Sequence, residues 1–516
     1  MPSSVPDVRP ASKGLLRLAL AALGLLTLLR LVLAATTPLA PDETYYWLWS
    51  RVLQPGYFDG PPMVALWIRA GTWLLGPTAL GVRLLGPLSA ALGSVLLWHA
   101  AEALLPGRRA GLVAAALLNA TLLLGVGSVI MTPDTPLLFF WVACLWALAR
   151  FSRDRNAWWM VVAAMAAGAA FDAKYTAVFL LVGTIAWLLW VPSLRRFWRT
   201  PVPYWAGLFG LQLAMPVVNW NRAHHWVSFL KQGGRLAHWH PLQAPRFLVE
   251  LAATQLGLAT PLVLVLCVAG VAVAARRAWR EREPGASLLV LLSLPAAAVF
   301  VQHCFAGRVQ GNWPAVIYPA AVIAAAGLEA PRWRRLLRPA VLLGLAIAAL
   351  VSVQAATGVL ALPPRRDPTA FRLAGWGRFA RAVAAAQTAH GARYVAATDY
   401  DVASELAFHL PRGVRLVGVE PRWRWFALPR AGIAGVPGQH GGQHGGQHGA
   451  RRGLLVRSLR RAGPPDPAPW AAIRPIGVLW RRRGAGGGPA GRVAGYALFL
   501  VRARPSVIPA VLLPRP

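Results

Sequence analysis

The chain has 516 residues, of which 56% are hydrophobic and only 14% are charged, and its mean hydropathy of +0.48 lies above that of soluble globular proteins. The formal net charge of +35 comes mainly from arginines in short loops and a C-terminal segment, so it indicates membrane topology and anionic lipid rather than nucleic acid. Composition therefore predicts a polytopic membrane protein.

Apolar stretches long enough to cross a bilayer recur through the first 360 residues. They lie at about 14–35, 83–104, 111–130, 135–150, 157–171, 175–192, 203–220, 251–274, 286–303, 313–329 and 339–358. We therefore expect about eleven transmembrane helices. The first is too long for the apolar region of a signal peptide, so we expect it to be retained.

Basic residues alternate between successive loops. If the N-terminus is cytoplasmic, every second loop is basic, as the positive-inside rule requires. These loops contain Arg108 and Arg109; Arg150, Arg153 and Arg155; Arg195, Arg196 and Arg199; Arg276, Arg277 and Arg280; and Arg332, Arg334 and Arg335. The opposite loops are 36–82, 128–134, 221–250 and 304–312, and they are expected outside the cytoplasm together with the C-terminal segment.

A proline-rich joint, "ALPPRRDPTAF", ends the membrane region. We assign residues 1–360 to a transmembrane domain and 361–516 to an extracytoplasmic C-terminal α/β domain. In the latter, "GARYVAATDYDVASELAFHL" predicts a strand, a loop with Asp399 and Asp401, and a helix from about Ser404.

A Gly-Gln-His repeat occupies residues 438–449 within the C-terminal segment. It is typical of a flexible, glycine-rich loop. The alternative is adventitious metal binding by its three histidines, His440, His444 and His448.

The stretch "APDETYYWLWSRVLQPGYFDGPPM" places two adjacent acids in an outer loop. In structural terms, Asp42 is a good helix N-cap, and Glu43 is a favourable first-turn charge for a helix whose aromatic residues lie at the membrane interface. In functional terms, a partly desolvated carboxylate at the membrane edge can take a proton from an acceptor hydroxyl. The two roles are compatible.

Two further charged residues lie at the outer ends of apolar segments. Asp134, in "PDTPLLFFW", is either a helix-capping residue or the second acid of a paired site. Lys174, in "AKYTAVFLL", suits a lipid phosphate at headgroup depth. The alternatives for Lys174 are snorkelling without function and a simple pair with Asp172.

Two outer loops carry polar groups that suit a phosphate or a sugar, although a solvated loop and an interfacial helix explain them equally well. The loop before the 313–329 segment contains His303, Arg308, Gln310 and Asn312. The long loop that follows the 203–220 segment is entered through Asn219, Asn221, His225 and Trp226.

Other kinds of site are not indicated by the sequence. Cys144, Cys267 and Cys304 lie far apart in or beside apolar segments, which indicates packing rather than disulfides or zinc. There is no Walker A pattern, and no GxGxxG lies between a strand and a helix. The energy for any chemistry must therefore arrive with the substrate.

Taken in order, "PDETYYW…GYFDGPPM", "PDTPLLFFW", "AKYTAVFLL", "VNWNRAHHWVSF", "GNWPAVIYP" and "YDVASELAFHLP" resemble the bacterial glycosyltransferases related to the protein O-mannosyltransferases and the lipid A aminoarabinose transferase. The resemblance implies a mainly α GT-C fold in the bacterial plasma membrane. It also implies a polyprenyl-phosphate sugar donor and a glycolipid, glycan or protein acceptor.

By position, the resemblance makes Asp42 the catalytic base or its organiser, Glu43 its neighbour, Asp134 a second essential acid and Lys174 a cation of the cavity. The donor-binding set implied with them is Lys174, Arg308, Tyr45, Tyr57 and Asn312. The chain departs from the aminoarabinose branch at Gly60, where that branch carries a lysine, which leaves the phosphate counter-charge to Lys174, Arg308 or a divalent metal ion.

The expected reaction is a single displacement at the anomeric carbon with inversion. The alternative is a transporter or flippase of lipid-linked sugars without transferase activity. The sequence favours transfer, because the polar residues gather at one membrane face and no inverted hydropathy repeat is visible.

Overall fold

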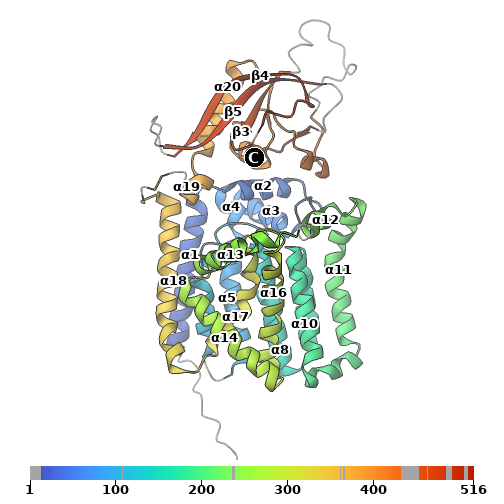
Figure 1. Ribbon diagram of the computed structural model, residues 1–516, viewed down its shortest axis with the longest axis vertical. Helices are drawn as coiled ribbons and strands as arrows, with labels where there is room; N and C mark the ends of the chain where they lie inside the picture. Colours follow the sequence, from blue (N-terminus) through green and yellow to red (C-terminus); the bar gives the residue numbers. More distant parts are fainter. Residues whose placement is uncertain are drawn as a thin grey trace, which may run out of the picture. The chain divides into compact units, whose positions relative to one another are not determined.

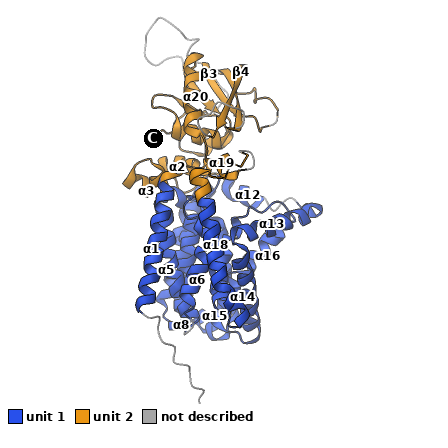
Figure 2. Ribbon diagram, turned by 90° about the vertical axis from the view of Figure 1, so that its left-hand side faces the viewer, with its two compact units in different colours: residues 1–35, 59–67, 83–352 blue, residues 36–58, 68–82, 353–516 orange. Residues whose placement is uncertain are grey.

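The computed structural model describes residues 13–106, 109–234, 239–360, 362–363, 367–431, 452–461, 463–483, 491–504 and 510–516. The Gly-Gln-His repeat lies outside these residues. The chain divides into two compact units, drawn in different colours in Figure 2. The first comprises Met1–Ala35, Asp59–Trp67 and Arg83–Ser352, and the second comprises Thr36–Phe58, Ile68–Val82 and Val353–Pro516. The division that we expect at residue 360 stays a prediction.

The first unit is a bundle of helices (Figure 1). Its helices are α1 (Lys13–Thr36), α5 (Leu85–Leu104), α6 (Ala110–Asn119), α7 (Leu122–Gly125), α8 (Asp134–Asp154), α9 (Trp158–Phe171), η1 (Tyr175–Ala177), α10 (Val178–Trp190), η2 (Pro192–Arg199), α11 (Val202–Ala223), α12 (Val227–Gly233), η4 (Pro241–Gln243), α13 (Ala244–Leu258), α14 (Pro261–Arg280), α15 (Pro284–Leu291), α16 (Leu294–His303), η5 (Trp313–Ile317), α17 (Tyr318–Ala326) and α18 (Pro331–Thr357).

In the described part of the chain, six helices are long and apolar enough to cross a membrane, or seven if the bent pair of Tyr175–Trp190 and Pro192–Arg199 counts as one span. The chain is therefore a multi-span membrane protein, as its composition predicts. The expected number of eleven is not confirmed. Several of the expected stretches form shorter apolar helices, such as Ala110–Asn119 and Trp158–Phe171.

The prediction of a single helix over residues 251–274 is wrong. This segment is divided between α13 and α14, which are separated by Ala259 and Thr260. Thr260 has a φ of 66°, and Pro261 follows it as the first residue of α14. A residue before proline is disfavoured in the helical conformation, and proline suits a helix start, so the break follows from the sequence.

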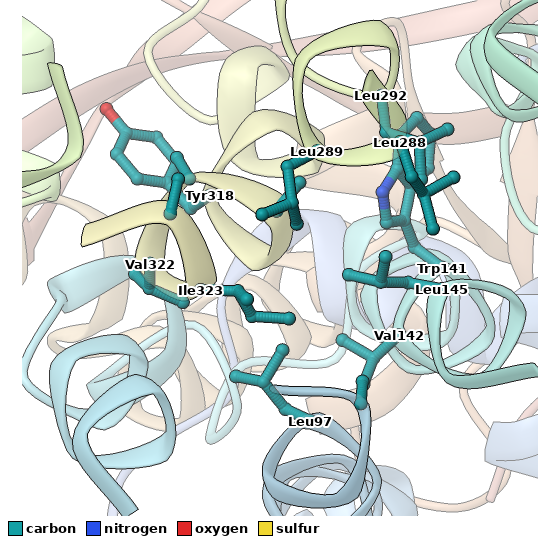
Figure 3. Packing of buried hydrophobic residues seen from close by; sticks show 14 of the residues in the cluster. Leu97, Trp141, Val142, Leu145, Leu288, Leu289, Leu292, Tyr318, Val322 and Ile323 are labelled. Atoms are coloured by element: carbon teal, nitrogen blue, oxygen red, sulfur yellow. The ribbon is translucent and has the colours of Figure 1, made fainter. Parts of the chain in front are cut away.

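The core of the first unit is formed by apolar side chains from several helices (Figure 3). The labelled side chains come from α5, α8, α15, the residue that follows α15, and α17: Leu97, Trp141, Val142, Leu145, Leu288, Leu289, Leu292, Tyr318, Val322 and Ile323. Helices α9 and α11 approach closely at Gly168 and Gly210, since a Cβ at Gly168 would lie 2.4 Å from the Gly210 carbonyl oxygen. Small residues at such crossings are typical of packed membrane helices.

The second unit contains a mixed six-stranded sheet. Its strands are β1 (Tyr394–Ala397), β2 (Leu416–Gly418), β3 (Arg452–Ser458), β4 (Trp470–Arg482), β5 (Arg492–Ala503) and β6 (Val511–Leu512), in the order β4-β5-β3-β1-β2-β6. Strand β1 is parallel to β2 and β3, while the β2–β6, β3–β5 and β4–β5 pairs are antiparallel. The expected α/β character is therefore confirmed.

The second unit also contains helical segments. They are α2 (Pro41–Arg51), most of α3 (Met63–Leu75) and α4 (Ala79–Arg83), α19 (Pro368–Leu373), α20 (Trp376–Ala389), α21 (Tyr400–His409) and η6 (Pro421–Trp425). The strand expected before Asp399 is present as β1. The helix after it begins at Tyr400 rather than near Ser404, so Asp401 lies in its first turn instead of a loop.

A buried carboxyl group lies on α21. The Glu405 side chain is fully buried, and its Oε2 is 3.3 Å from His409 Nε2. Burial raises the pKa of Glu405 to about 7, helped by the nearby Glu43 charge and opposed by His409 and Arg481. The folded state therefore keeps a proton on Glu405 up to near neutral pH.

This proton gives the stability a predictable pH dependence. In the unfolded chain the Glu405 carboxyl titrates near its ordinary pKa of 4.5, so between there and about 7 only the folded state holds the proton. Stability should fall as pH rises through this window. A Glu405→Gln substitution cannot ionise and should reduce the fall, measured as the difference in Tm of the full chain between about pH 5 and about pH 8.

The exposed Asp466, in the same unit, supplies the control, because Asp466→Asn should leave that difference unchanged. An equal fall in Tm in the wild type and in Glu405→Gln would contradict the assignment of the proton to Glu405.

Candidate active site

In the first unit, a carboxylate is held between two side chains from other segments. Asp134, the first residue of α8, accepts hydrogen bonds from Lys174 Nζ at its Oδ1 and from Asn312 Nδ2 at its Oδ2, both at 2.7 Å. The Asp134 and Lys174 side chains are 17% and 21% exposed, so the ion pair is largely shielded from solvent. Each carboxylate oxygen therefore has a donor from a different part of the chain.

The Asp134 and Lys174 side chains contact each other rather than a helix end or Asp172. Asp134 makes no capping hydrogen bond, because Pro133 is the N-cap residue, and the Thr135 hydroxyl instead accepts the Thr132 N–H. Lys174 extends from the connection between α9 and η1 to Asp134 rather than to Asp172. The expectation of a capping role for Asp134 is therefore wrong, as is the Lys174–Asp172 pair.

A second ion pair in the first unit joins Asp59, in "GYFDGPP", to Lys231 of α12. The neighbouring Gln232 Nε2 also donates to the Asp59 carbonyl oxygen, at 2.8 Å. Neither residue of the pair was a candidate from the sequence. Lys231 therefore brings an ammonium group to the residue before Gly60, and no atom lies within 4 Å of a Cβ placed at Gly60.

The long loop after α11 is anchored by a buried asparagine. Asn221 is fully buried; its Nδ2 donates to the Tyr175 hydroxyl at 3.3 Å, and its Oδ1 accepts the Phe229 N–H at 3.2 Å. The Tyr175 and Ser228 hydroxyls are 2.8 Å apart. Asn221 therefore fixes the loop rather than presenting its amide to a ligand.

The remaining candidates of the first unit lie at its surface. Asn219, His225 and Trp226 are exposed, and Trp226 stacks on Phe229 with ring centroids 5.8 Å apart. Arg308 is 69% exposed, and its Nε is 2.9 Å from Glu250 Oε2. Arg308 is thus already paired with a carboxylate.

The two acids of α2 belong to the second unit and have different surroundings. Ala40 is the N-cap residue, and the buried Glu43 carboxylate accepts the Ala40 N–H at 2.9 Å. The expectation that Asp42 caps the helix is therefore wrong, because Glu43 reaches back to the N-cap instead.

Asp42 is held by two residues of the C-terminal part of the chain. Its Oδ2 accepts a hydrogen bond from Arg372 Nη1 at 2.8 Å, and its Oδ1 lies 3.4 Å from the Tyr400 hydroxyl. The Arg422 guanidinium lies 3.9 Å from the centroid of the Tyr400 ring, and its Nε donates to Glu420 Oε1 at 3.0 Å. Within the second unit, a line of polar contacts therefore runs from η6 to Asp42.

Aromatic residues of this stretch form the packing around α2. Tyr45 is 2% exposed, and its ring centroid is 4.8 Å from that of Tyr400. Tyr57 is fully buried; its hydroxyl donates to the carbonyl oxygens of Trp49 and Val52, both at 2.9 Å, and accepts the Gln54 N–H at 3.1 Å. The Tyr57 hydroxyl is thus fully engaged in closing the loop after α2.

Among the described residues, no three His, Cys, Asp or Glu side chains are grouped so as to hold a metal ion. Cys144, Cys267 and Cys304 are buried and unbridged, in agreement with a packing role.

Three comparisons relate the chain to known proteins. The family model of the dolichyl-phosphate-mannose-protein mannosyltransferases matches residues 59–220. Lipid A galacturonosyltransferase RgtD of Rhizobium johnstonii is 29% identical over 377 residues, which cover 72% of this chain and 77% of that protein.

The crystal structures of ArnT from Cupriavidus metallidurans resemble the chain over nearly its whole length. The structure bound to undecaprenyl phosphate gives a TM-score of 0.59 at 15% identity, and the apo structure gives 0.57 at 16%. Each match covers 95% of this chain and 98% of that chain. At such identity, the likeness establishes a shared fold.

The Asp134–Lys174 pair predicts non-additive stability effects. Lys174→Met leaves the shielded carboxylate with Asn312 alone and should destabilise the chain by roughly 2 kcal/mol. Adding Asp134→Asn removes the unpaired charge, so the double variant should lose less stability than the sum of the two single variants. Thermal unfolding in detergent measures this coupling.

The matched control is the more exposed pair of Arg150 and Asp154, four residues apart at the other end of α8 and 2.7 Å from each other. The effects of Arg150→Met and Asp154→Asn should add to within about 0.5 kcal/mol. Additivity in both pairs would contradict a shielded ion pair at Asp134.

Proposed function

We propose that this chain, a member of the GT-C superfamily of membrane glycosyltransferases, transfers a sugar from a polyprenyl-phosphate donor to an acceptor outside the cytoplasm. The observation that carries this proposal is the carboxylate of Asp134, which is held by Lys174 and Asn312 from two other segments. Charged groups fixed at helix ends suit a lipid substrate whose charged and reactive atoms lie at the membrane surface.

The proposed reaction is one displacement at the anomeric carbon. The acceptor oxygen forms a bond to that carbon while the bond from the carbon to the phosphate oxygen breaks, and its electron pair leaves with the polyprenyl phosphate. The proton of the acceptor hydroxyl passes to a carboxylate, for which Asp42 is our candidate. A single displacement inverts the configuration of the sugar.

The contacts of Asp42 support its role as a general base, because they fix the orientation of its carboxylate. Arg372 and Tyr400 each contact one of its oxygens, and the side chain remains 36% exposed. A positioned carboxylate with solvent access can approach an acceptor hydroxyl without rotating first. Glu43 is assigned the supporting role of fixing the start of α2, because its carboxylate is used in capping.

The negative charge that develops on the leaving phosphate needs a cation nearby. Lys174 is our first candidate, followed by Arg308. Lys231 joins them because it pairs with Asp59, the residue before Gly60, and Gly60 is the position at which the aminoarabinose branch carries its own lysine. A divalent metal ion is a further candidate for this charge.

For the acceptor, we propose a glycolipid of the lipid A class. The support is the 29% identity to RgtD, which is named as a lipid A galacturonosyltransferase and is matched over 77% of its length. We further propose that the N-terminus is cytoplasmic and that the C-terminal part lies on the opposite side, as the alternation of basic loops indicates.

The assignment of the acids can be tested by transfer of labelled sugar in vesicles. Asp42→Asn should lower the rate by at least about 100-fold, because it removes a general base. Asp134→Asn should lower it by about 10-fold or more through loss of positioning. Asp154→Asn, at the other end of α8, should stay within about twofold of the wild type.

Two readouts of this assay distinguish the outcomes. Label that moves to an acceptor indicates transfer, whereas label that crosses the bilayer unchanged indicates a flippase and would refute the proposal. Transfer near the wild-type rate in both Asp42→Asn and Asp134→Asn, with normal insertion, would leave the enzyme but refute these residues as its acids.

A further inference from the structure

A guanidinium group lies directly beside the candidate base, Asp42. Arg372, in the last turn of α19, donates from its Nη1 to Asp42 Oδ2 at 2.8 Å, and its side chain is 60% exposed. An acceptor hydroxyl that gives its proton to Asp42 must come within hydrogen-bond distance of this carboxylate. The groups next to that hydroxyl on the acceptor then lie close to the exposed part of Arg372.

Helix α19 holds Arg372 in a fixed place. Its N-cap residue, Asp367, is paired with Arg483 Nη1 at 2.8 Å, directly after the end of β4. At the other end of the helix, the buried Arg481 of β4 donates to the Ala374 carbonyl oxygen. The short helix is therefore fastened at both ends to the end of one strand, which limits the positions that Arg372 can take.

A second guanidinium group reaches α19 from the turn after β3. Arg460 is exposed, and its Cζ lies 3.8 Å from the centroid of the ring of Phe371, the residue before Arg372. A guanidinium over an aromatic ring uses its face for this contact, whereas its N–H donors lie in its plane. Among the described residues, these side-chain donors of Arg460 form no hydrogen bond and no ion pair with the chain.

One carboxylate positions both this turn and a partner of the candidate base. Asp399 accepts the Ser458 N–H at 3.2 Å and is paired with Arg461, the residue after Arg460. Asp399 is also the N-cap residue of α21, whose first residue, Tyr400, contacts the candidate base. The turn that carries Arg460 and the start of α21 are thus fixed to each other within the second unit.

The charge balance at this corner of the second unit favours an anion from outside the chain. Arg372 and Arg461 each have a carboxylate partner, whereas Arg460 has none among the described residues. The sequence around them offers few others, because residues 361–516 contain 24 arginines, no lysine and six acidic residues. An exposed guanidinium without a carboxylate partner attracts anions and can bind one through two parallel hydrogen bonds.

We propose that Arg372 and Arg460 form an anion subsite that binds a phosphate or carboxylate group of the acceptor beside its reacting hydroxyl. Each guanidinium presents a planar fork that matches two oxygens of such a group. The anion subsite therefore selects an acidic glycolipid over a neutral one. This inference rests on the proposed function for the role of Asp42, and it adds the chemical group by which the second unit recognises the acceptor.

The test measures the affinity of the purified full chain in detergent for two probes, namely lipid A with its phosphate groups and the same lipid after their removal. Removal should raise the Kd of the wild type by about 5-fold or more. It should raise the Kd of Arg460→Met by less than about twofold, because the group that contacts the phosphate is already absent. Arg460→Lys should give an intermediate factor, since it keeps the charge without the fork.

A second pair of probes identifies a carboxylate as the source of the charge. It consists of lipid A extended by an acidic sugar, with the carboxyl group of that sugar either intact or reduced to an alcohol. The pair of probes whose difference disappears in Arg460→Met names the group that is bound. If the wild type and Arg460→Met show equal factors in both pairs, the proposal is overturned.

Arg502→Met is the matched control, because it removes an exposed arginine from a distant place in the same unit. Ala494 of β5 pairs with Arg481, which holds α19, and Arg502 lies about 26 Å further along this strand. Its response to the probes should equal that of the wild type. If Arg502→Met responds as Arg460→Met does, the attraction comes from the overall charge, and the anion subsite is refuted.

Transfer kinetics and thermal unfolding separate recognition from a structural role. Arg460→Met should raise the KM for the phosphorylated acceptor by a larger factor than it lowers kcat. Arg372→Met should change both constants, because Arg372 also orients Asp42. A lower Tm of Arg460→Met together with the wild-type response to the probes would assign Arg460 a structural role alone and overturn the proposal.

The two readouts also keep this inference distinct from the proposed function. If binding of the acidic probes depends on Arg460 while no sugar transfer is observed, the proposed function fails and the anion subsite stands. If transfer occurs while the wild type binds the acidic and neutral probes equally, the proposed function stands and the anion subsite is refuted.

Discussion

The bond between Lys174 and Asp134 shows how this chain meets a constraint that acts on every charge near a membrane: a shielded ion needs a partner of opposite charge or several hydrogen-bond donors. Three segments of the first unit meet at this carboxylate, namely the start of α8, the connection after α9 and the residue before η5. The start of α8 is thus tied to two other segments by polar contacts, while apolar side chains form the core of the bundle.

The fold was largely predictable because its signals are local. Apolar runs predict helices, and a strand followed by a polar loop predicts β1 and α21. The boundaries were less predictable where helix and turn signals compete, as at Thr260 and Pro261. The number of spans is likewise not fixed by apolar runs alone, since several runs form helices too short to qualify by length.

The candidate site was predictable in part. Asp134 and Lys174 were expected at one membrane face, and the structure places them in contact. The partners of Asp42 and Asp59 were not predictable, because Arg372 and Lys231 lie 330 and 172 residues away in the sequence and occur in segments without a distinctive pattern.

The capping of α2 by Glu43 has a consequence for the neighbouring acid. A carboxylate that accepts backbone N–H groups at a helix start is committed to them and presents fewer lone pairs to anything else. Because the longer glutamate side chain reaches back to Ala40, the oxygens of Asp42 remain available to Arg372 and Tyr400. The order of the two acids therefore determines their roles. If aspartate and glutamate were exchanged, the aspartate at position 43 would be one methylene group shorter than the side chain that now reaches the Ala40 N–H.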